Sequence, residues 1–155
     1  KKEKINNFGT YAVNSLRIEK AYRGWGAELT GEISLVEASM DRFFNLNKKS
    51  NFIGSEVLRD KVQSGVDIKI VYLEIDADGA DARGNEPVYH ENKIVGVVTS
   101  GAYGFRVKKS LAFAYVKSKL AKEGTELFIE IQGQKRKAKI LNLPAYDPEN
   151  KMLKS

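Results

Sequence analysis

The chain has 155 residues, about the size of one ordinary domain, and combines 42% hydrophobic with 30% charged residues, so neither a disordered chain nor a membrane span fits. It has no cysteine and a single histidine, which excludes disulfide frameworks, thiolate metal sites and cysteine nucleophiles and leaves acid–base chemistry to Asp, Glu, Lys or Tyr. Its 26 basic and 20 acidic residues give a net charge of +6, which suits an anionic partner and equally suits solubility.

The N-terminal stretch begins with the charged run Lys1 to Lys4 and shows neither an initiator Met nor an apolar signal-like segment. We therefore expect this sequence to be part of a longer polypeptide. The first predicted element is a helix over Phe8 to Tyr22, because apolar residues recur there at helical spacing and asparagines precede it as possible N-caps. The apolar positions are Phe8, Ala12, Val13 and Leu16, and the possible caps are Asn6 and Asn7.

Two further elements are expected before residue 66. A mixed alternating and apolar stretch favours a strand over Met40 to Leu46. An apolar stripe at helical spacing favours a helix over Glu56 to Gln63, which Gly54 or Ser55 can cap and Gly65 can end.

The pattern changes to strands from Val66 onward. Apolar residues occupy both faces of residues 68–75, which is typical of a well-buried strand, and later apolar segments are separated by tight turns at Glu91-Asn92 and at Gly133. Many short strands without an intervening helix predict a small antiparallel barrel or sandwich over Val66 to Leu143. Its predicted core includes Ile70, Leu73, Val97, Phe113 and Ile129.

Common nucleotide and metal motifs are missing. Gly101-Ala102-Tyr103-Gly104 has the wrong spacing for a dinucleotide fingerprint, and no Walker A sequence occurs. The acidic loop of Asp76, Asp78 and Asp81 lacks the closing Glu and the flanking helices of a calcium-binding loop, so a solvated turn is the favoured interpretation. We therefore expect no metal site.

Four segments resemble the aminomethyltransferase (glycine-cleavage T-protein) superfamily, and the closest likeness is to the C-terminal part of dimethylglycine and sarcosine dehydrogenases. Each segment alone is weak evidence, but four in the family's order with compatible spacing are strong evidence, and together they cover nearly the whole chain. The segments are Tyr11 to Glu28, which holds Leu16-Arg17-Ile18-Glu19, Asn51 to Leu58, Gly96 to Gly101, which holds Thr99-Ser100-Gly101, and Ser110 to Val116.

The resemblance implies an α+β fold in which a helix/strand segment of a folate-binding domain precedes a small antiparallel β-barrel. We expect residues 1–65 to be a remnant of the aminomethyltransferase-like domain and residues 66–155 to be the C-terminal barrel domain. Thr99-Ser100-Gly101 is then the barrel's structural contribution to the interface between the two, with Gly101 needed for backbone shape.

The resemblance also implies an activity. In such enzymes a one-carbon unit passes from an amine-derived donor to tetrahydrofolate. The family's catalytic aspartate and, in the dehydrogenases, the FAD-binding portion lie upstream and match no residue here. We therefore expect no catalytic residue in this chain, a partner in the upstream part of the same parent protein, and no transfer activity from this chain alone.

Glu19 is the leading candidate for contacting the folate. A pterin ring presents two adjacent N–H donors, and a carboxylate matches that pair with two charge-assisted hydrogen bonds. The resemblance implies this role for the glutamate at this motif position. The alternative is an exposed helix glutamate that pairs with Arg23 four residues later.

The resemblance implies further folate contacts. Tyr11 lies a little over two helical turns before Glu19 and can face the same cavity, although core packing is the alternative. Ile18 and Lys20 flank Glu19, and Trp25 replaces the tyrosine usual in T-proteins, with a ring that can line the pterin. Lys48 falls where an arginine of some relatives holds the glutamate tail, and an exposed loop lysine is the alternative.

A second class of function is considered from composition. A basic barrel can bind RNA or single-stranded nucleic acid if aromatic rings are exposed on one sheet face beside lysines and arginines. The residues required are Tyr89, Tyr103, Phe105, Phe113, Lys108, Lys109 and Arg136. We favour the folate module over a nucleic-acid partner, expect no membrane partner, and expect a cytoplasmic protein, or one of the mitochondrial matrix in a eukaryote.

Overall fold

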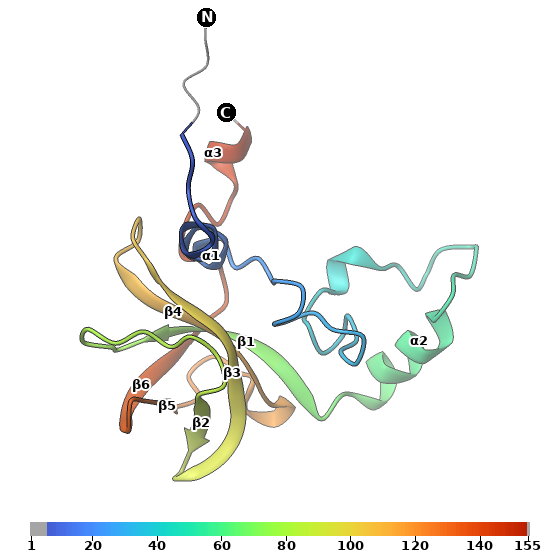
Figure 1. Cartoon of the computed structure of the whole chain (residues 1–155). Helices are drawn as coiled ribbons and strands as arrows, with labels where there is room; N and C mark the ends of the chain where they lie inside the picture. The colour runs from blue at the N-terminus through green and yellow to red at the C-terminus, as the bar shows by residue number, and fades with distance from the viewer. Residues whose placement is uncertain (1–5, 155) are drawn as a thin grey trace, which may run out of the picture.

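A small β-barrel carries an extended N-terminal segment in this computed structural model, which describes residues 6–154 (Figure 1). No helix in that range is long and apolar enough to cross a bilayer. The elements are α1 (Thr10–Glu19), η1 (Asp41–Phe43), α2 (Ser55–Ser64), β1 (Ile68–Ile75), β2 (Pro87–His90), β3 (Lys93–Gly104), β4 (Lys109–Lys117), η2 (Ser118–Leu120), β5 (Leu127–Ile131), β6 (Gln134–Leu141) and α3 (Lys151–Lys154).

The six strands close into one antiparallel barrel in the order β1-β4-β3-β2-β5-β6. The β2–β3 hairpin turns at Glu91 and Asn92, with φ of 47° and 62°, and the β5–β6 hairpin turns at Gln132 and Gly133, with φ of 51° and 76°. Two successive positive φ values give the twist that a two-residue hairpin needs. The barrel and both turns predicted from the sequence are confirmed.

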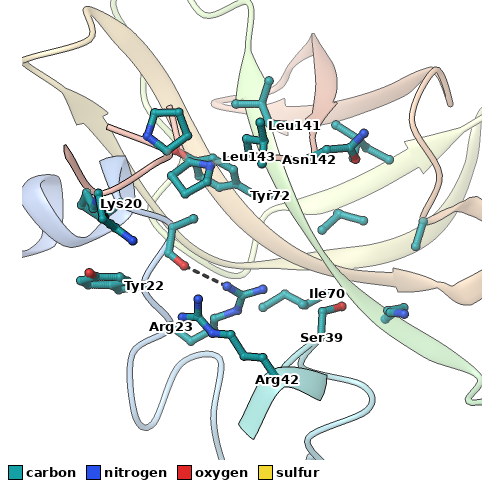
Figure 2. A pocket seen from close by; sticks show the side chains of 18 residues that line it. Lys20, Tyr22, Arg23, Ser39, Arg42, Ile70, Tyr72, Leu141, Asn142 and Leu143 are labelled. Atoms are coloured by element: carbon teal, nitrogen blue, oxygen red, sulfur yellow. Dashed lines mark hydrogen bonds between the residues drawn. The ribbon is translucent and has the colours of Figure 1, made fainter. Parts of the chain in front are cut away.

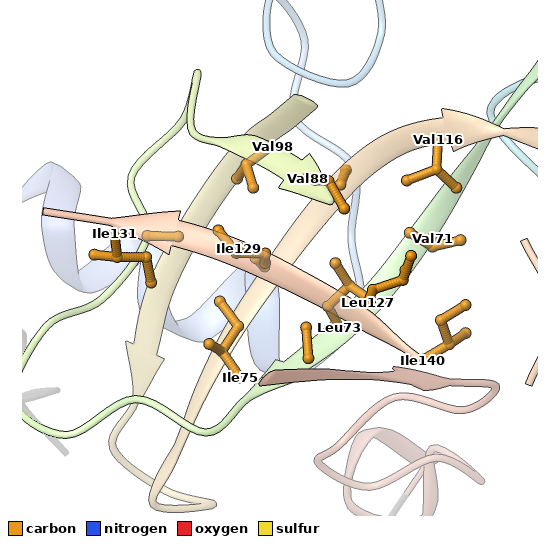
Figure 3. Close-up of a cluster of buried hydrophobic side chains, with 14 residues drawn as sticks. Val71, Leu73, Ile75, Val88, Val98, Val116, Leu127, Ile129, Ile131 and Ile140 are labelled. Carbon is orange, nitrogen blue, oxygen red and sulfur yellow. The ribbon is translucent and has the colours of Figure 1, made fainter. Parts of the chain in front are cut away.

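The barrel interior is filled by alanine and branched apolar side chains from all six strands (Figure 3). On β1, Val71, Leu73 and Ile75 face inward with the period of two that a strand imposes. Leu73 and Ile129, two predicted core residues, are fully buried here. Burying a side chain of this size contributes about 1.5–3 kcal/mol, so this cluster stabilises the barrel independently of the N-terminal segment.

A second apolar cluster lies on the outer side of the barrel wall, between β1, β4 and α1. The intervening β1 residues Ile70 and Tyr72 join Phe113 and other β4 residues, and Ile18 of α1 closes the cluster with an exposed fraction of 0%. Ile70 and Phe113 are therefore buried as predicted, but they anchor α1 to the barrel rather than fill its interior.

Val97 was the one wrong member of the predicted core, since it is 42% exposed. The pairing of β2 with β3 shifts register between Val88 and Tyr89, where Gly96 and Ile94 are the successive partners. The extra residue reverses the inward and outward alternation, so Val98, at 1% exposed, faces the interior instead. A bulge of this kind has no signal in the apolar pattern.

The N-terminal segment departs from expectation in two places. α1 is shorter than the predicted helix, and Gly9 takes the N-cap position without a side-chain hydrogen bond, so Asn6 and Asn7 do not cap it. The strand predicted over Met40 to Leu46 is wrong, because a single 3-10 turn, η1, forms there after Ser39 adopts a φ of 50°.

The second predicted helix is confirmed as α2. It begins after Gly54, with φ of 84°, and ends at Gly65, with φ of 83°. Positive φ at both flanking residues is the reason that glycine stands at each end.

Candidate functional site

α1 packs on the barrel through the buried Ile18 and through hydrogen bonds from two polar side chains. Asn14 Nδ2 donates to the Gly101 carbonyl at 3.1 Å, and Ser15 Oγ donates to the Tyr103 carbonyl at 2.7 Å. β3 therefore binds α1 partly by hydrogen bonds to its backbone. The apolar positions that predicted this helix lie on its exposed side: Phe8, Val13 and Leu16 are 68%, 46% and 57% exposed, and Ala12 is also exposed.

A buried carboxylate ties the loop after α1 to the same strand. Glu28 is 0% exposed, and its Oε2 accepts from the Gly24 N–H at 2.7 Å and from Arg17 at 3.2 Å. Its Oε1 accepts from the hydroxyls of Thr99 at 2.7 Å and Ser100 at 2.6 Å. The Gly24 and Arg17 hydrogen bonds fix Glu28 within the N-terminal segment, and the two hydroxyl hydrogen bonds hold that segment on β3 of the barrel.

This Glu28 network places Thr99-Ser100-Gly101 at the interface, as the resemblance implied. Sequence reasoning gave no role to Arg17 and Glu28, because nothing in the spacing of two opposite charges predicts that one will be fully enclosed. Gly101 is required by space rather than by backbone angle, since a Cβ there would lie 2.3 Å from the Ala82 carbonyl oxygen.

Glu19 is buried at the C-terminal end of α1, with an exposed fraction of 2%. Its Oε1 accepts from the backbone N–H groups of Arg106 at 2.7 Å and Val107 at 3.3 Å, both in the β3–β4 turn. Its Oε2 has no hydrogen-bond partner within residues 6–154. The alternative of an exposed ion pair with Arg23 is wrong, because Glu19 is enclosed and Arg23 does not pair with it.

The neighbours of Glu19 are held on two sides. Ile18 is fully buried in the outer apolar cluster. Lys20 Nζ donates to the Asp147 carbonyl and to Asn150 Oδ1, both at 2.7 Å, and lies 3.4 Å from the Asp147 carboxylate. The C-terminal segment therefore contacts the end of α1. Together with the outer apolar cluster it holds Ile18, Glu19 and Lys20 in place as one unit.

The remaining candidates lie on the surface. Tyr11 is 88% exposed and Trp25 is 82% exposed, so the core-packing alternative for Tyr11 is wrong. Lys48 lies in the exposed loop between η1 and α2, which extends away from α1 and the barrel (Figure 1), with its Nζ 4.8 Å from the Phe52 ring centroid. The structure does not gather these three around Glu19.

A pocket of about 470 Å³ lies next to this unit, bounded by the residues after α1, the outer face of β1 and the chain after β6 (Figure 2). Tyr72 lines it with a buried hydroxyl. Burial, reinforced by the negative charges of Glu19 and Glu74, raises the pKa of Tyr72 to about 12, while the Ala145 N–H opposes the rise without completing a hydrogen bond. The phenol therefore remains a donor at neutral pH.

The features required for nucleic-acid binding are not assembled on the barrel. Phe113 is fully buried, and the Tyr89 hydroxyl donates to Glu130 at 2.9 Å. Base stacking needs exposed rings along one face, so the interpretation that uses Phe113 is wrong. Within residues 6–154 no three His, Asp or Glu side chains converge as metal ligands.

Comparisons with known proteins match the fold and the segments described above. The family model described as the glycine cleavage T-protein C-terminal barrel domain matches residues 69–147, and the GCVT N-terminal domain model matches residues 1–48. The chain therefore belongs to the glycine cleavage T-protein family.

Particular relatives cover nearly all of the chain. It is 41% identical to mitochondrial dimethylglycine dehydrogenase of Rattus norvegicus over 92% of its length, and 34% identical to an aminomethyltransferase of a Synechocystis species over 92%. The crystal structure of glycine cleavage system aminomethyltransferase T from Bartonella henselae superposes with a TM-score of 0.81 at 26% identity over 88% of the chain. The chain spans 17%, 38% and 38% of these three proteins.

Proposed function

We propose that this chain is the C-terminal, tetrahydrofolate-binding portion of an enzyme that passes a one-carbon unit from an amine to tetrahydrofolate. The single observation that carries the proposal is the state of Glu19 in a member of this family. One oxygen of its carboxylate is fixed by the β3–β4 turn, and the other has no hydrogen-bond partner among the described residues.

The chemistry of this carboxylate fits a pterin edge. An ionised carboxylate offers about four acceptor positions on two oxygens, and the backbone of Arg106 and Val107 uses positions on Oε1 only. Oε2 is free to accept a hydrogen bond from an N–H donor on the pterin edge. The side chain is 2% exposed, so we propose that the pterin meets Oε2 with the edge that carries its N–H groups.

The other proposed contacts have separate roles. The exposed rings of Tyr11 and Trp25 can cover an apolar ligand face. Lys20 holds the C-terminal segment beside Glu19 and Ile18 fixes the helix, so both position the carboxylate. Lys48, on its exposed loop, supplies a charge for a ligand carboxylate at the periphery.

We propose the division suggested by the sequence, with residues 1–65 belonging to the folate-binding domain and residues 66–155 to the barrel domain. The exposed apolar side of α1 fits this division, because large exposed apolar surfaces mark contacts with other protein parts. We assign its cover to the upstream part of the parent protein, where the proton-transfer residue and, in a dehydrogenase, the FAD site would lie. We place that protein in the cytoplasm, or in the mitochondrial matrix if its source is eukaryotic, as the mitochondrial dimethylglycine dehydrogenases suggest.

Calorimetric titration of tetrahydrofolate into this chain and its Glu19→Gln variant tests the proposal. The amide oxygen of Gln can keep the Arg106 and Val107 hydrogen bonds, which leaves its NH₂ group at the Oε2 position facing the pterin donors. Loss of a charged hydrogen bond costs about 1.5–3 kcal/mol, so binding should weaken by roughly ten- to a hundred-fold.

The matched control is Glu32→Gln, an exposed glutamate on the loop after Glu28, which should leave the affinity unchanged. Two results contradict the proposal: a dissociation constant above about 1 mM for the unsubstituted chain, or an affinity of Glu19→Gln within about twofold of it, a difference of only about 0.4 kcal/mol.

A further inference from the structure

The pocket beside the end of α1 is strongly cationic (Figure 2). Its lining includes four basic residues, Lys20, Arg23, Arg42 and Lys69, and no Asp or Glu among the described residues. Lys20 is already bound to Asp147 and Asn150, so its charge is paired at the edge of the pocket. Arg23, Arg42 and Lys69 form no ion pair among the described residues, and the two arginines carry the planar groups that can bind an anion in pairs.

Arg23 is partly enclosed and incompletely bonded. Its Nη1 donates to the Ala21 carbonyl at 2.9 Å, the dashed contact in Figure 2, and its guanidinium carbon lies 5.3 Å from the Phe113 ring centroid. Its Nε is buried without a hydrogen-bond partner within residues 6–154. An unbonded buried donor costs free energy comparable to a lost hydrogen bond, so the chain itself does not satisfy the Arg23 guanidinium at the wall of the pocket.

Arg42 reaches the same pocket from η1. Its guanidinium carbon lies 4.8 Å from the Phe43 ring centroid, and it forms no ion pair with a carboxylate in the described range. Burial, and next the charge of Arg42, lower the pKa of Arg23. Two like charges that face one cavity repel each other unless an anion lies between them.

The remaining lining suits a small ligand with an apolar part. The buried Tyr72 hydroxyl, which has no partner in the described range, lines this cavity, and Ile70, Leu141 and Leu143 supply apolar surface. The lining therefore combines two guanidinium groups with further donors on Tyr72, Ser39, Lys69 and Asn142. Planar guanidinium forks match carboxylate and phosphate oxygens in pairs.

We propose that this pocket binds a small anion bearing carboxylate or phosphate groups, held by the guanidinium groups of Arg23 and Arg42 and by the Tyr72 hydroxyl. The anionic groups can come from two sources, a free metabolite or the glutamyl part of a folate. The anion site does not use the Glu19 carboxylate, so a failure of this proposal can be told apart from a failure of the proposed function.

The test uses citrate and inorganic phosphate, titrated calorimetrically into the full chain and two variants. Arg42→Gln is the main variant because Arg42 is exposed and makes no ion pair, so the fold should survive its loss. We expect it to weaken binding of at least one of the two anions about tenfold or more. Arg83→Gln, an exposed arginine outside the pocket, is the matched control and should leave binding unchanged.

Competition experiments with folate compounds identify the source of the anion. Displacement of the bound anion by pteroylglutamate but not by pteroic acid, which lacks the glutamate, assigns the site to a folate tail; displacement by neither assigns it to a free anion. Glu19→Gln should retain anion binding in both cases. No binding of either anion with a dissociation constant below about 10 mM, or an equal loss in Arg42→Gln and Arg83→Gln, would overturn the proposal.

Discussion

Replacing Glu28 by Ala should be among the most damaging single changes in the N-terminal segment. The side chain is fully buried and accepts four hydrogen bonds, two from groups on the α1 side and two from hydroxyls on β3. Removing one partner of a buried ion pair typically costs about 3–5 kcal/mol. Arg17, the partner, is 18% exposed, which places the expected loss near the lower end of that range.

Urea unfolding followed by circular dichroism measures this loss. With a slope of about 1–3 kcal/mol per molar urea, a loss of about 3 kcal/mol lowers the midpoint by about 1–3 M. Glu28→Gln should be milder, because its amide oxygen can face Gly24 and Arg17 while its NH₂ donates to the hydroxyls of Thr99 and Ser100. Glu32→Ala is the exposed control. A loss below about 1 kcal/mol in Glu28→Ala, the value of an exposed ion pair, would refute the reasoning.

Three further outcomes are expected. Stability should fall as pH rises from about 10 toward 12, because burial raises the pKa of Tyr72 and of Tyr115 to about 12 and the folded state then binds more protons; Tyr72→Phe should remove the Tyr72 share of this loss in pH-dependent urea titrations, and an unchanged profile would count against it. Gly101→Ala should lower the unfolding midpoint, because its Cβ would meet the Ala82 carbonyl, whereas Gly31→Ala, with open space around it, should not; equal effects would contradict the packing argument. The chain alone should show no one-carbon transfer from dimethylglycine or sarcosine to tetrahydrofolate, and measurable turnover would disprove that.

The barrel was predictable because its signals are local. Strand alternation and two-residue turns depend on neighbouring residues, and the pattern over Val66 to Leu143 contained both. Val97 failed because a bulge on β3 moves the alternation by one residue, and pairing with a distant strand decides where a bulge forms. The strand predicted over residues 40–46 was also wrong. A short apolar stretch does not distinguish a strand from the 3-10 turn that forms there.

The site was predictable only in part. Resemblance pointed to Glu19, but not to the β3–β4 turn that fixes its Oε1, because Arg106 and Val107 act through backbone N–H groups that any residue supplies. The apolar spacing predicted the helix α1 but not which side of it faces the barrel, and the hydrogen bonds of α1 to β3 come from Asn14 and Ser15. The cover that we propose for the exposed apolar side, an upstream part of a longer protein, could not be read from the spacing.

The most direct test of the account compares two ligands on two proteins. Tetrahydrofolate and an analogue in which a methyl group replaces the exocyclic amine differ by one donor, which is proposed to meet Glu19 Oε2. The unsubstituted chain should bind tetrahydrofolate about tenfold or more tightly than the analogue, and the Glu19→Gln variant should bind the two ligands equally. Making the same ligand change on both proteins isolates the hydrogen bond between the exocyclic amine and Glu19. The same preference in both proteins would show that Glu19 does not bind the pterin and would contradict the central claim.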